Sequence, residues 1–118
     1  MDIVIRSQNL PQDGGFALIE NEMLVPGGSA ANVSVALHLL GADVWQTGKI
    51  GDDRFGIAFR DDLVANGINV DLLVVKKGGA TLHTYILTTN DGQHCIFANL
   101  GDAVINLEVS DLPQDALN

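Results

Sequence analysis

Hydrophobic and polar positions follow two rhythms along the chain, one typical of strands and one typical of helices. Short apolar runs bounded by turn residues predict strands over 2–7, 16–25, 42–51 and 70–77. Apolar residues at helical spacing predict a helix over 53–67 that Gly67 ends. Strands that alternate with helices through short links indicate a parallel βαβ layer with right-handed crossovers.

A second helix is predicted from Ser29 to Leu40, where the residues are small and apolar on nearly every side. Ser29 is placed to cap its start, and Gly41 stands where a helix end favours a left-handed residue. A helix without a polar face is usually buried. We therefore expect this helix to lie against a sheet.

The pattern changes after Gly79, where two alternating stretches, 81–89 and 93–99, flank the turn sequence "NDG". Glycine in the third turn position predicts a three-residue hairpin loop with Gly92 in the left-handed conformation. This register pairs Thr84 with Ala98 and Ile86 with Ile96 on one face, with Tyr85, Leu87 and Phe97 on the other. An antiparallel sheet drawn from 2–25 and 81–99 should thus accompany the parallel layer, and 109–117 predicts the start of a further helix.

Composition limits the possible partners and the location. The 118 residues suffice for one small domain or a piece of a larger one, and 15 acidic against 6 basic residues give a net charge of −9. Such a surface repels phosphate backbones and anionic lipid, which argues against nucleic acid and membrane partners. The start lacks the layout of a signal peptide, which predicts a cytoplasmic protein. Cys95, the single cysteine, excludes an internal disulfide and is expected to be buried.

The glycine-rich stretch "PGGSAANVSVALHLLG" (26–41) matches neither a Walker A loop nor the dinucleotide fingerprint. Its fixed positions instead resemble the first signature of the PfkB (ribokinase-like) carbohydrate kinases, and "GKIGDDRFG" (48–56) and "ANGINVDLL" (66–73) continue the resemblance, which runs from residue 2 to about 113. The matching positions of the signature are Gly27, Gly28, Ala30, Asn32, Ser34, Gly41 and Gly51.

The resemblance implies a ribokinase-like parallel α/β sandwich, present in part, with a small antiparallel β-sheet lid. Residues 1–118 would form a single partial kinase domain, with lid strands from about 2–25 and 81–99 and an α/β core from about 27–77 and 100–118. Members of this family transfer the γ-phosphoryl group of ATP, with Mg²⁺, to a hydroxyl of a sugar or nucleoside. The expected partner is such a small molecule.

The resemblance also implies which residues bind the substrate. Glycine permits close approach to the backbone, and an asparagine side chain both donates and accepts hydrogen bonds, as a hydroxyl does. A polyol is therefore expected against the glycine-rich turn, under the lid. The implied substrate-binding residues are Asp2, Gly28, Ser29, Asn32, Thr84, Ile96 and Ala98.

The sequence departs from the family at three places. Members usually begin with an apolar strand ahead of the position of Asp2, and they continue into a Gly-Ala-Gly-Asp segment that supplies the catalytic base, the anion hole and most of the ATP site. Neither is present, so we expect no catalytic base in these residues, a chain that is a fragment, and no activity of the chain alone. Ser29 stands where ribokinases carry lysine, which leaves the acceptor open.

Simpler interpretations compete with these roles. Asp2 could be a solvated charge and Ser29 only a helix cap, whereas Asn32 is a poor helix former whose position favours function. The pair Asp52 and Asp53 is interpreted as helix capping rather than as an acid–base dyad. The three histidines, His38, His83 and His94, share no metal-ligand spacing, so no metal site is expected.

Two other functions remain open at this stage. The chain could be a non-catalytic, truncated remnant whose exposed lid strands pair with a second copy to give a homodimer. A dehydrogenase-type nucleotide domain is a third hypothesis, and it requires that NAD perturb the fluorescence of Trp45.

Overall fold

The computed structural model describes residues 1–112. Residues 113–117 of the expected final helix lie outside them. In chain order the elements are β1 (Asp2–Ser7), β2 (Ile19–Val25), α1 (Ser29–Leu39), β3 (Gly48–Gly51), α2 (Arg54–Ala65), β4 (Leu73–Lys76), β5 (His83–Thr89), β6 (His94–Asn99) and the 3₁₀ turns η1 (Val104–Asn106) and η2 (Val109–Asp111).

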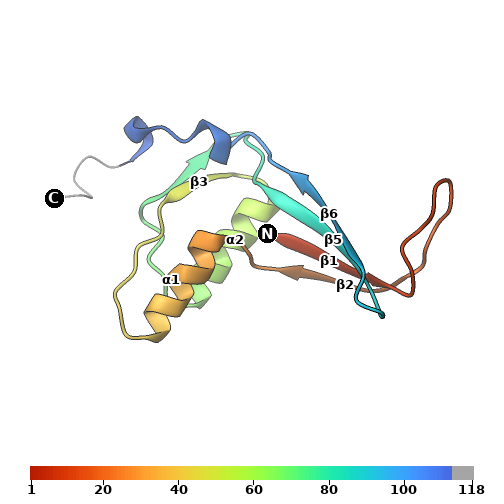
Figure 1. The fold of residues 1–118 in the computed structure, drawn as a ribbon. Helices are drawn as coiled ribbons and strands as arrows, with labels where there is room; N and C mark the ends of the chain where they lie inside the picture. Colours follow the sequence, from red (N-terminus) through yellow and green to blue (C-terminus); the bar gives the residue numbers. More distant parts are fainter. Residues whose placement is uncertain (113–118) are drawn as a thin grey trace.

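A four-stranded sheet with the order β2-β1-β5-β6 extends to one side of the helices (Figure 1). The pairs β1–β2 and β5–β6 are antiparallel, but β1 and β5 run parallel, with Asp2 opposite Thr84. The sheet is therefore mixed, and the expectation of a purely antiparallel one is wrong in this pair. The whole α/β layer separates β1 from β5 in sequence, and so long a crossover can bring two strands back in parallel.

The hairpin of β5 and β6 has the predicted register. Thr84 pairs with Ala98 and Ile86 with Ile96, and Gly92 adopts a φ of 87°. Turn chemistry fixed this register because the loop length and the single left-handed residue leave few alternatives. Cys95 is only half-buried, so the expectation of a buried cysteine is wrong.

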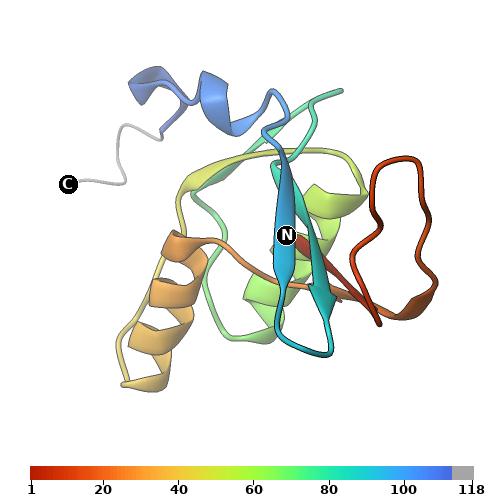
Figure 2. The same ribbon diagram turned by 45° about the vertical axis from the view of Figure 1, so that its right-hand side comes forward.

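The second sheet is the parallel pair β3–β4, in which Gly48 lies opposite Leu73. The strand expected over 42–51 is shorter than predicted, because the residues before Gly48 form no continuous ladder with the neighbouring segment, only an isolated bridge between Trp45 and Asn69. Figure 2 shows α1 and α2 below this layer, with the chain after β6 passing above it. No helix within residues 1–112 is long and apolar enough to cross a membrane.

Two small apolar clusters hold the layers together. One joins Met1 and Ile3 of the four-stranded sheet to Phe55 of α2. The other joins Ala31 of α1 to Leu63 and Ile68. Each cluster has few fully buried members, which predicts modest stability.

Helix α1 is less buried than its sequence predicts. Only Ala31 and Ser34 are buried, whereas 79% of Leu39 and 58% of Val33 are exposed. Within residues 1–112 its buried side packs against α2 and the segments that follow each helix, while its opposite apolar face is open to water. The expectation of a buried helix is therefore wrong.

Two lysines on neighbouring strands fasten the segment that follows β6. Lys49 of β3 binds Asp111 at 2.8 Å, and Lys76 of β4 binds Asp102 at 2.7 Å. The hydrogen bonds from Ala80 and Lys76 lower the pKa of Asp102, and the hydrogen bond from Lys49 lowers that of Asp111. Both ion pairs therefore persist in mildly acidic solution.

We expect the 118-residue chain to be marginally stable and to self-associate, because apolar side chains and strand edges are open to water. Val75 on β4, Leu37 on α1 and Phe97 on β6 are each about half exposed, and exposed parallel strands and edges favour pairing between copies. Sedimentation velocity over a range of concentrations, combined with urea unfolding, measures both properties. A concentration-independent monomer that unfolds in one cooperative step at high urea would contradict this expectation.

Candidate functional site

The polar residues of the candidate site converge from three elements that are distant in sequence. Asp2 begins β1, and its neighbours across the sheet are Val25 at the end of β2 and Thr84 at the start of β5. The chain leaves β2 through Pro26 into the glycine turn and then enters α1. The sheet register therefore brings a carboxylate, a hydroxyl and a helix start to the same corner.

The carboxylate of Asp2 is held by one hydrogen bond and lies against the glycine turn. The Thr84 hydroxyl donates to Asp2 Oδ1 at 2.6 Å, and the other oxygen, Oδ2, lies so close to Gly27 that a Cβ there would stand 2.1 Å from it. Only glycine permits this approach without displacing the carboxylate. Gly27, one of the positions of the matched signature, therefore leaves the space in which the Asp2 carboxylate lies.

Helix α1 begins at this corner with unpaired donors. Its N-cap residue is Gly28, with φ 106° and ψ 132°, and no side chain caps the helix. The amide of Asn32 makes the first intrahelical bond, to the Gly28 carbonyl, so the amides of residues 29–31 have no intrahelical acceptor. Ser29 is the first helical residue rather than the cap, and the capping interpretation of Ser29 is wrong. Free helix N–H groups favour an oxygen-rich or anionic ligand.

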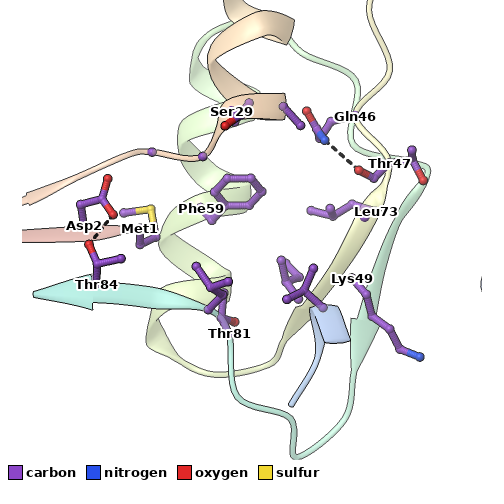
Figure 3. Close-up of a pocket in the computed structure, with 18 residues that line it drawn as sticks. Met1, Asp2, Ser29, Gln46, Thr47, Lys49, Phe59, Leu73, Thr81 and Thr84 are labelled. Carbon is purple, nitrogen blue, oxygen red and sulfur yellow. Dashed lines mark hydrogen bonds between the residues drawn. The ribbon is translucent and has the colours of Figure 1, made fainter. Parts of the chain in front are cut away.

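A cavity of about 370 Å³ opens at this corner and continues along β3 (Figure 3). Asp2 and Thr84 face each other at one end, Ser29 lies above, and Gln46 and Lys49 lie at the opposite end. Phe59 and Leu73 stand between the two ends. The cavity thus has a polar corner suited to hydroxyl groups and an apolar body that can only offer packing.

The structure brings together four of the seven candidate residues. Asp2, Gly28, Ser29 and Thr84 line the cavity. Asn32 is exposed on the first turn of α1 and lies outside the lining, as do Ala98 and Ile96, both exposed on β6. The roles of these three in binding therefore stay predictions.

Sequence reasoning did not find several lining residues. Lys49 lies in the matched motif "GKIGDDRFG", but its ammonium group points away from the cavity and binds Asp111 (Figure 3). Phe59 could not be found, because an aromatic residue at helical spacing reads as core. Thr81 precedes β5 by two residues, and only the tertiary structure shows that it reaches the cavity.

The capping interpretation of the adjacent aspartates is confirmed for Asp53, whose side chain accepts from the Gly56 amide at the start of α2. Asp52 accepts from the Gly78 amide instead. Burial alone would raise the pKa of Asp53, but the hydrogen bonds from Thr81 and Gly56 prevail and lower it below the usual 3.8.

This lowered pKa predicts an acid-induced loss of stability. Because the folded pKa lies below the unfolded value, protonation favours the unfolded chain, so the contribution of Asp53 is complete above about pH 4 and disappears as the pH falls through the folded pKa. Urea unfolding at a series of pH values measures the effect. Asp53→Asn should lower the free energy of unfolding at neutral pH by about 1–3 kcal/mol. It should also reduce the fall of that free energy between neutral and acidic pH. If the variant loses as much stability on acidification as the wild type, the loss does not arise from Asp53.

Metal ligands do not cluster among the described residues, in which no group of three His, Cys, Asp or Glu side chains is placed to hold an ion. The N-terminus of α2 is occupied by the Asp53 carboxylate and is not open to a phosphate. Among residues 1–112, therefore, no side-chain cluster is placed to hold Mg²⁺, and the helix start that stays open to an anionic group is that of α1.

Comparison with known proteins gives a consistent picture. The sequence model of a family described as "pfkB family carbohydrate kinase" matches residues 1–117. The chain is 35% identical over 100 residues to an ATP-dependent ribose-1-phosphate kinase of Halopiger xanaduensis, covering 85% of this chain and 34% of that protein. It is 35% identical over 106 residues to the ribokinase of Bacillus subtilis, covering 88% and 36%.

The fold is shared with solved structures. An Arabidopsis thaliana ribokinase complexed with ribose and ATP superimposes with a TM-score of 0.76 at 24% identity, covering 85% of this chain and 33% of that one. The ribokinase-like α/β fold with a lid sheet, present here in part, is thereby confirmed. The chain spans about a third of the length of the proteins it matches.

Proposed function

Because the chain belongs to the pfkB family of carbohydrate kinases, we propose that it forms the acceptor-binding part of an enzyme that transfers the γ-phosphoryl group of ATP to a sugar hydroxyl. One observation carries the proposal. The Asp2 carboxylate, the Thr84 hydroxyl and the free amides at the start of α1 meet at one corner of a cavity. These groups supply both acceptors and donors, which a polyol needs.

Each group has a distinct task in this proposal. The Asp2 carboxylate accepts hydrogen bonds from sugar hydroxyls, and Thr84 holds it in place. The amides of residues 29–31 donate to sugar oxygens, and the open space around Gly28 admits the sugar to the backbone. Phosphoryl transfer depends mainly on positioning and on neutralising charge. The described residues supply the positioning of the acceptor.

ATP and Mg²⁺ enter the proposal through the family, and they would supply the phosphoryl group and neutralise its charge. No cluster of side chains in residues 1–112 is placed to hold Mg²⁺, and Asp53 closes the start of α2, so the proposal assigns no catalytic base and no phosphoryl-transfer step to these residues. We therefore propose that the 118-residue chain alone is inactive. A cytoplasmic location, where ATP is available, belongs to the same proposal.

A nucleoside is the second candidate acceptor, because the cavity continues from the polar corner into an apolar body. Phe59, Leu73 and Ile50 line that body, and a flat base would bury apolar area against them. Ribose and a nucleoside share the sugar hydroxyls, so both satisfy the polar corner.

A non-catalytic, self-associating chain is the alternative function. Its support is the lid sheet, whose edge strands β2 and β6 carry half-exposed apolar residues such as Met23, Ile96 and Phe97. Strand edges of this kind favour pairing with a second copy. A homodimer through the lid sheet is compatible with either function.

A chimera tests the proposed function. Residues 1–112 are joined to the C-terminal two thirds of the B. subtilis ribokinase, and phosphorylation of ribose, fructose and adenosine is measured beside the 118-residue chain alone. We expect turnover by the chimera, with a preference among acceptors that differs from that of the intact ribokinase. The 118-residue chain alone should give no turnover. A folded chimera that phosphorylates no acceptor, or turnover by the chain alone, would contradict the proposal.

Asn32→Ala in the active chimera tests the role predicted for that residue. If Asn32 binds the acceptor, the loss of its hydrogen bonds should raise KM and lower kcat/KM by the equivalent of about 1–3 kcal/mol. Initial rates over a range of acceptor concentrations provide the measurement. An unchanged kcat/KM would show that the exposed Asn32 side chain does not reach the acceptor.

A further inference from the structure

The turn between β3 and α2 binds the start of β5 through one carboxylate. Asp53 Oδ1 accepts from the Gly56 amide at 2.8 Å and from the Thr81 hydroxyl at 2.7 Å, and Asp53 Oδ2 accepts from the Thr81 amide at 2.9 Å. The Thr81 hydroxyl oxygen in turn accepts from the Gly51 amide at 2.9 Å. Capping α2 requires only the first of these bonds. The two bonds to Thr81 go beyond the capping role.

Two glycines of the same turn let the segments approach closely enough for these bonds. A Cβ at Gly56 would stand 2.1 Å from the Gly51 carbonyl oxygen and 2.8 Å from the Thr81 hydroxyl. A Cβ at Gly51 would stand 2.0 Å from the Gly79 carbonyl oxygen. The spacing of glycine and aspartate in "GDDRFG" is thus required by contact with residues 79–81, which for Asp53 and Thr81 joins positions 28 apart in the chain.

A second contact fixes the next part of β5 against the same turn of α2. The ring of His83 stacks on Phe55 with centroids 4.0 Å apart, and His83 is buried. Its Nδ1 donates to the Thr81 carbonyl oxygen at 2.9 Å. The residue after His83 is Thr84, whose hydroxyl holds Asp2 in the cavity.

We propose that Asp53 is a positioning residue for acceptor binding, because its bonds to Thr81 fix the start of β5 so that Thr84 and Asp2 meet at the polar corner. The inference rests on the proposed function, and it assigns to the "GDDRFG" motif a task that neither the cavity lining nor helix capping accounts for. Asp53 acts on the acceptor only through Thr81 and β5.

The geometry requires aspartate rather than another capping residue. Three donors point at two oxygens, and the Thr81 amide faces Oδ2. In asparagine an NH₂ group replaces one of these oxygens. In either orientation of the side chain this donor faces another donor, either the Thr81 amide or the Gly56 amide and Thr81 hydroxyl, so at least one hydrogen bond is lost. Asp52 provides a matched control, since it is exposed and accepts only from the Gly78 amide.

The experiment compares Asp53→Asn and Asp52→Asn in the 118-residue chain labelled with ¹⁵N and ¹³C. Two quantities are measured by NMR: the chemical shifts of the Thr84 amide and the Asp2 carboxyl carbon, and the dissociation constant for D-ribose from a titration. In Asp53→Asn we expect both shifts to move and the dissociation constant to rise about tenfold, the equivalent of one lost hydrogen bond. In Asp52→Asn the two chemical shifts and the dissociation constant should stay at their wild-type values.

A folded Asp53→Asn variant with wild-type Thr84 and Asp2 shifts would overturn the inference. If Asp53→Asn does not fold, the pair Thr81→Ser and Thr81→Val decides, because only serine keeps the hydroxyl that reaches Asp53. Equal Thr84 and Asp2 shifts in these two variants would likewise overturn it. If the wild-type chain binds no ribose, the proposed function fails while the chemical shifts still test the positioning.

Discussion

Replacement of Gly51 by alanine is expected to unfold most of the chain. The added Cβ would stand 2.0 Å from the Gly79 carbonyl oxygen and 2.5 Å from its carbon, and both are backbone atoms that cannot move aside alone. Separating the two segments would also break the bond from the Gly51 amide to Thr81. We expect a loss of about 3 kcal/mol or more, which is a large fraction of the stability of a small domain. Urea or thermal unfolding followed by circular dichroism measures it.

Gly14→Ala is the matched control, because its Cβ would meet nothing within 4 Å and the cost arises only from its φ of 72°. That cost should be about 1–2 kcal/mol. If Gly51→Ala is no more destabilising than Gly14→Ala, the close contact between residues 51 and 79 is contradicted.

Replacement of Asp2 by asparagine is expected to reduce polyol binding about 10- to 100-fold, because hydrogen bonds to a charged acceptor contribute about 1.5–3 kcal/mol. The amide keeps the shape of the side chain and an oxygen that can accept from the Thr84 hydroxyl. The loss of affinity therefore measures the contribution of the negative charge. Titration with ribose, followed by NMR, measures the dissociation constant.

Asp13→Asn serves as its control, since Asp13 is an exposed loop residue and the variant makes the same change in net charge. Equal affinities in the two variants would show that the carboxylate of Asp2 is not a ligand. Thr84→Val should give a smaller loss, because it removes the group that holds the carboxylate and not the carboxylate itself.

Local patterns in the sequence predicted local structure well. The "NDG" turn sets the register of β5 and β6, since a short loop with one left-handed glycine allows few pairings. Capping chemistry identified Asp53 in the same way. The parallel pairing of β1 with β5 was missed, because it joins residues about 80 positions apart and no local pattern encodes it.

Site residues could be predicted from the sequence where the backbone conformation requires a particular residue type. They could not be predicted where they act through contacts between residues that are distant in sequence. Gly28 carries a φ of 106° that only glycine adopts readily. The bond between Asp53 and Thr81 has no sequence signature, because either residue alone reads as a cap or a strand residue. The exposure of α1 was missed because composition shows that a face is apolar, not whether another element covers it.

The most direct test of the central claim is an NMR titration of the ¹⁵N-labelled 118-residue chain with D-ribose, with tetrahydropyran as a ring of similar size that lacks hydroxyls. We predict saturable shifts at the amides of residues 28–31 and at Thr84, with a dissociation constant no better than millimolar, about −4 kcal/mol, and no such shifts with tetrahydropyran. Shifts that are absent up to the solubility of ribose, that spread evenly over the chain, or that tetrahydropyran reproduces would contradict a polyol site at this corner.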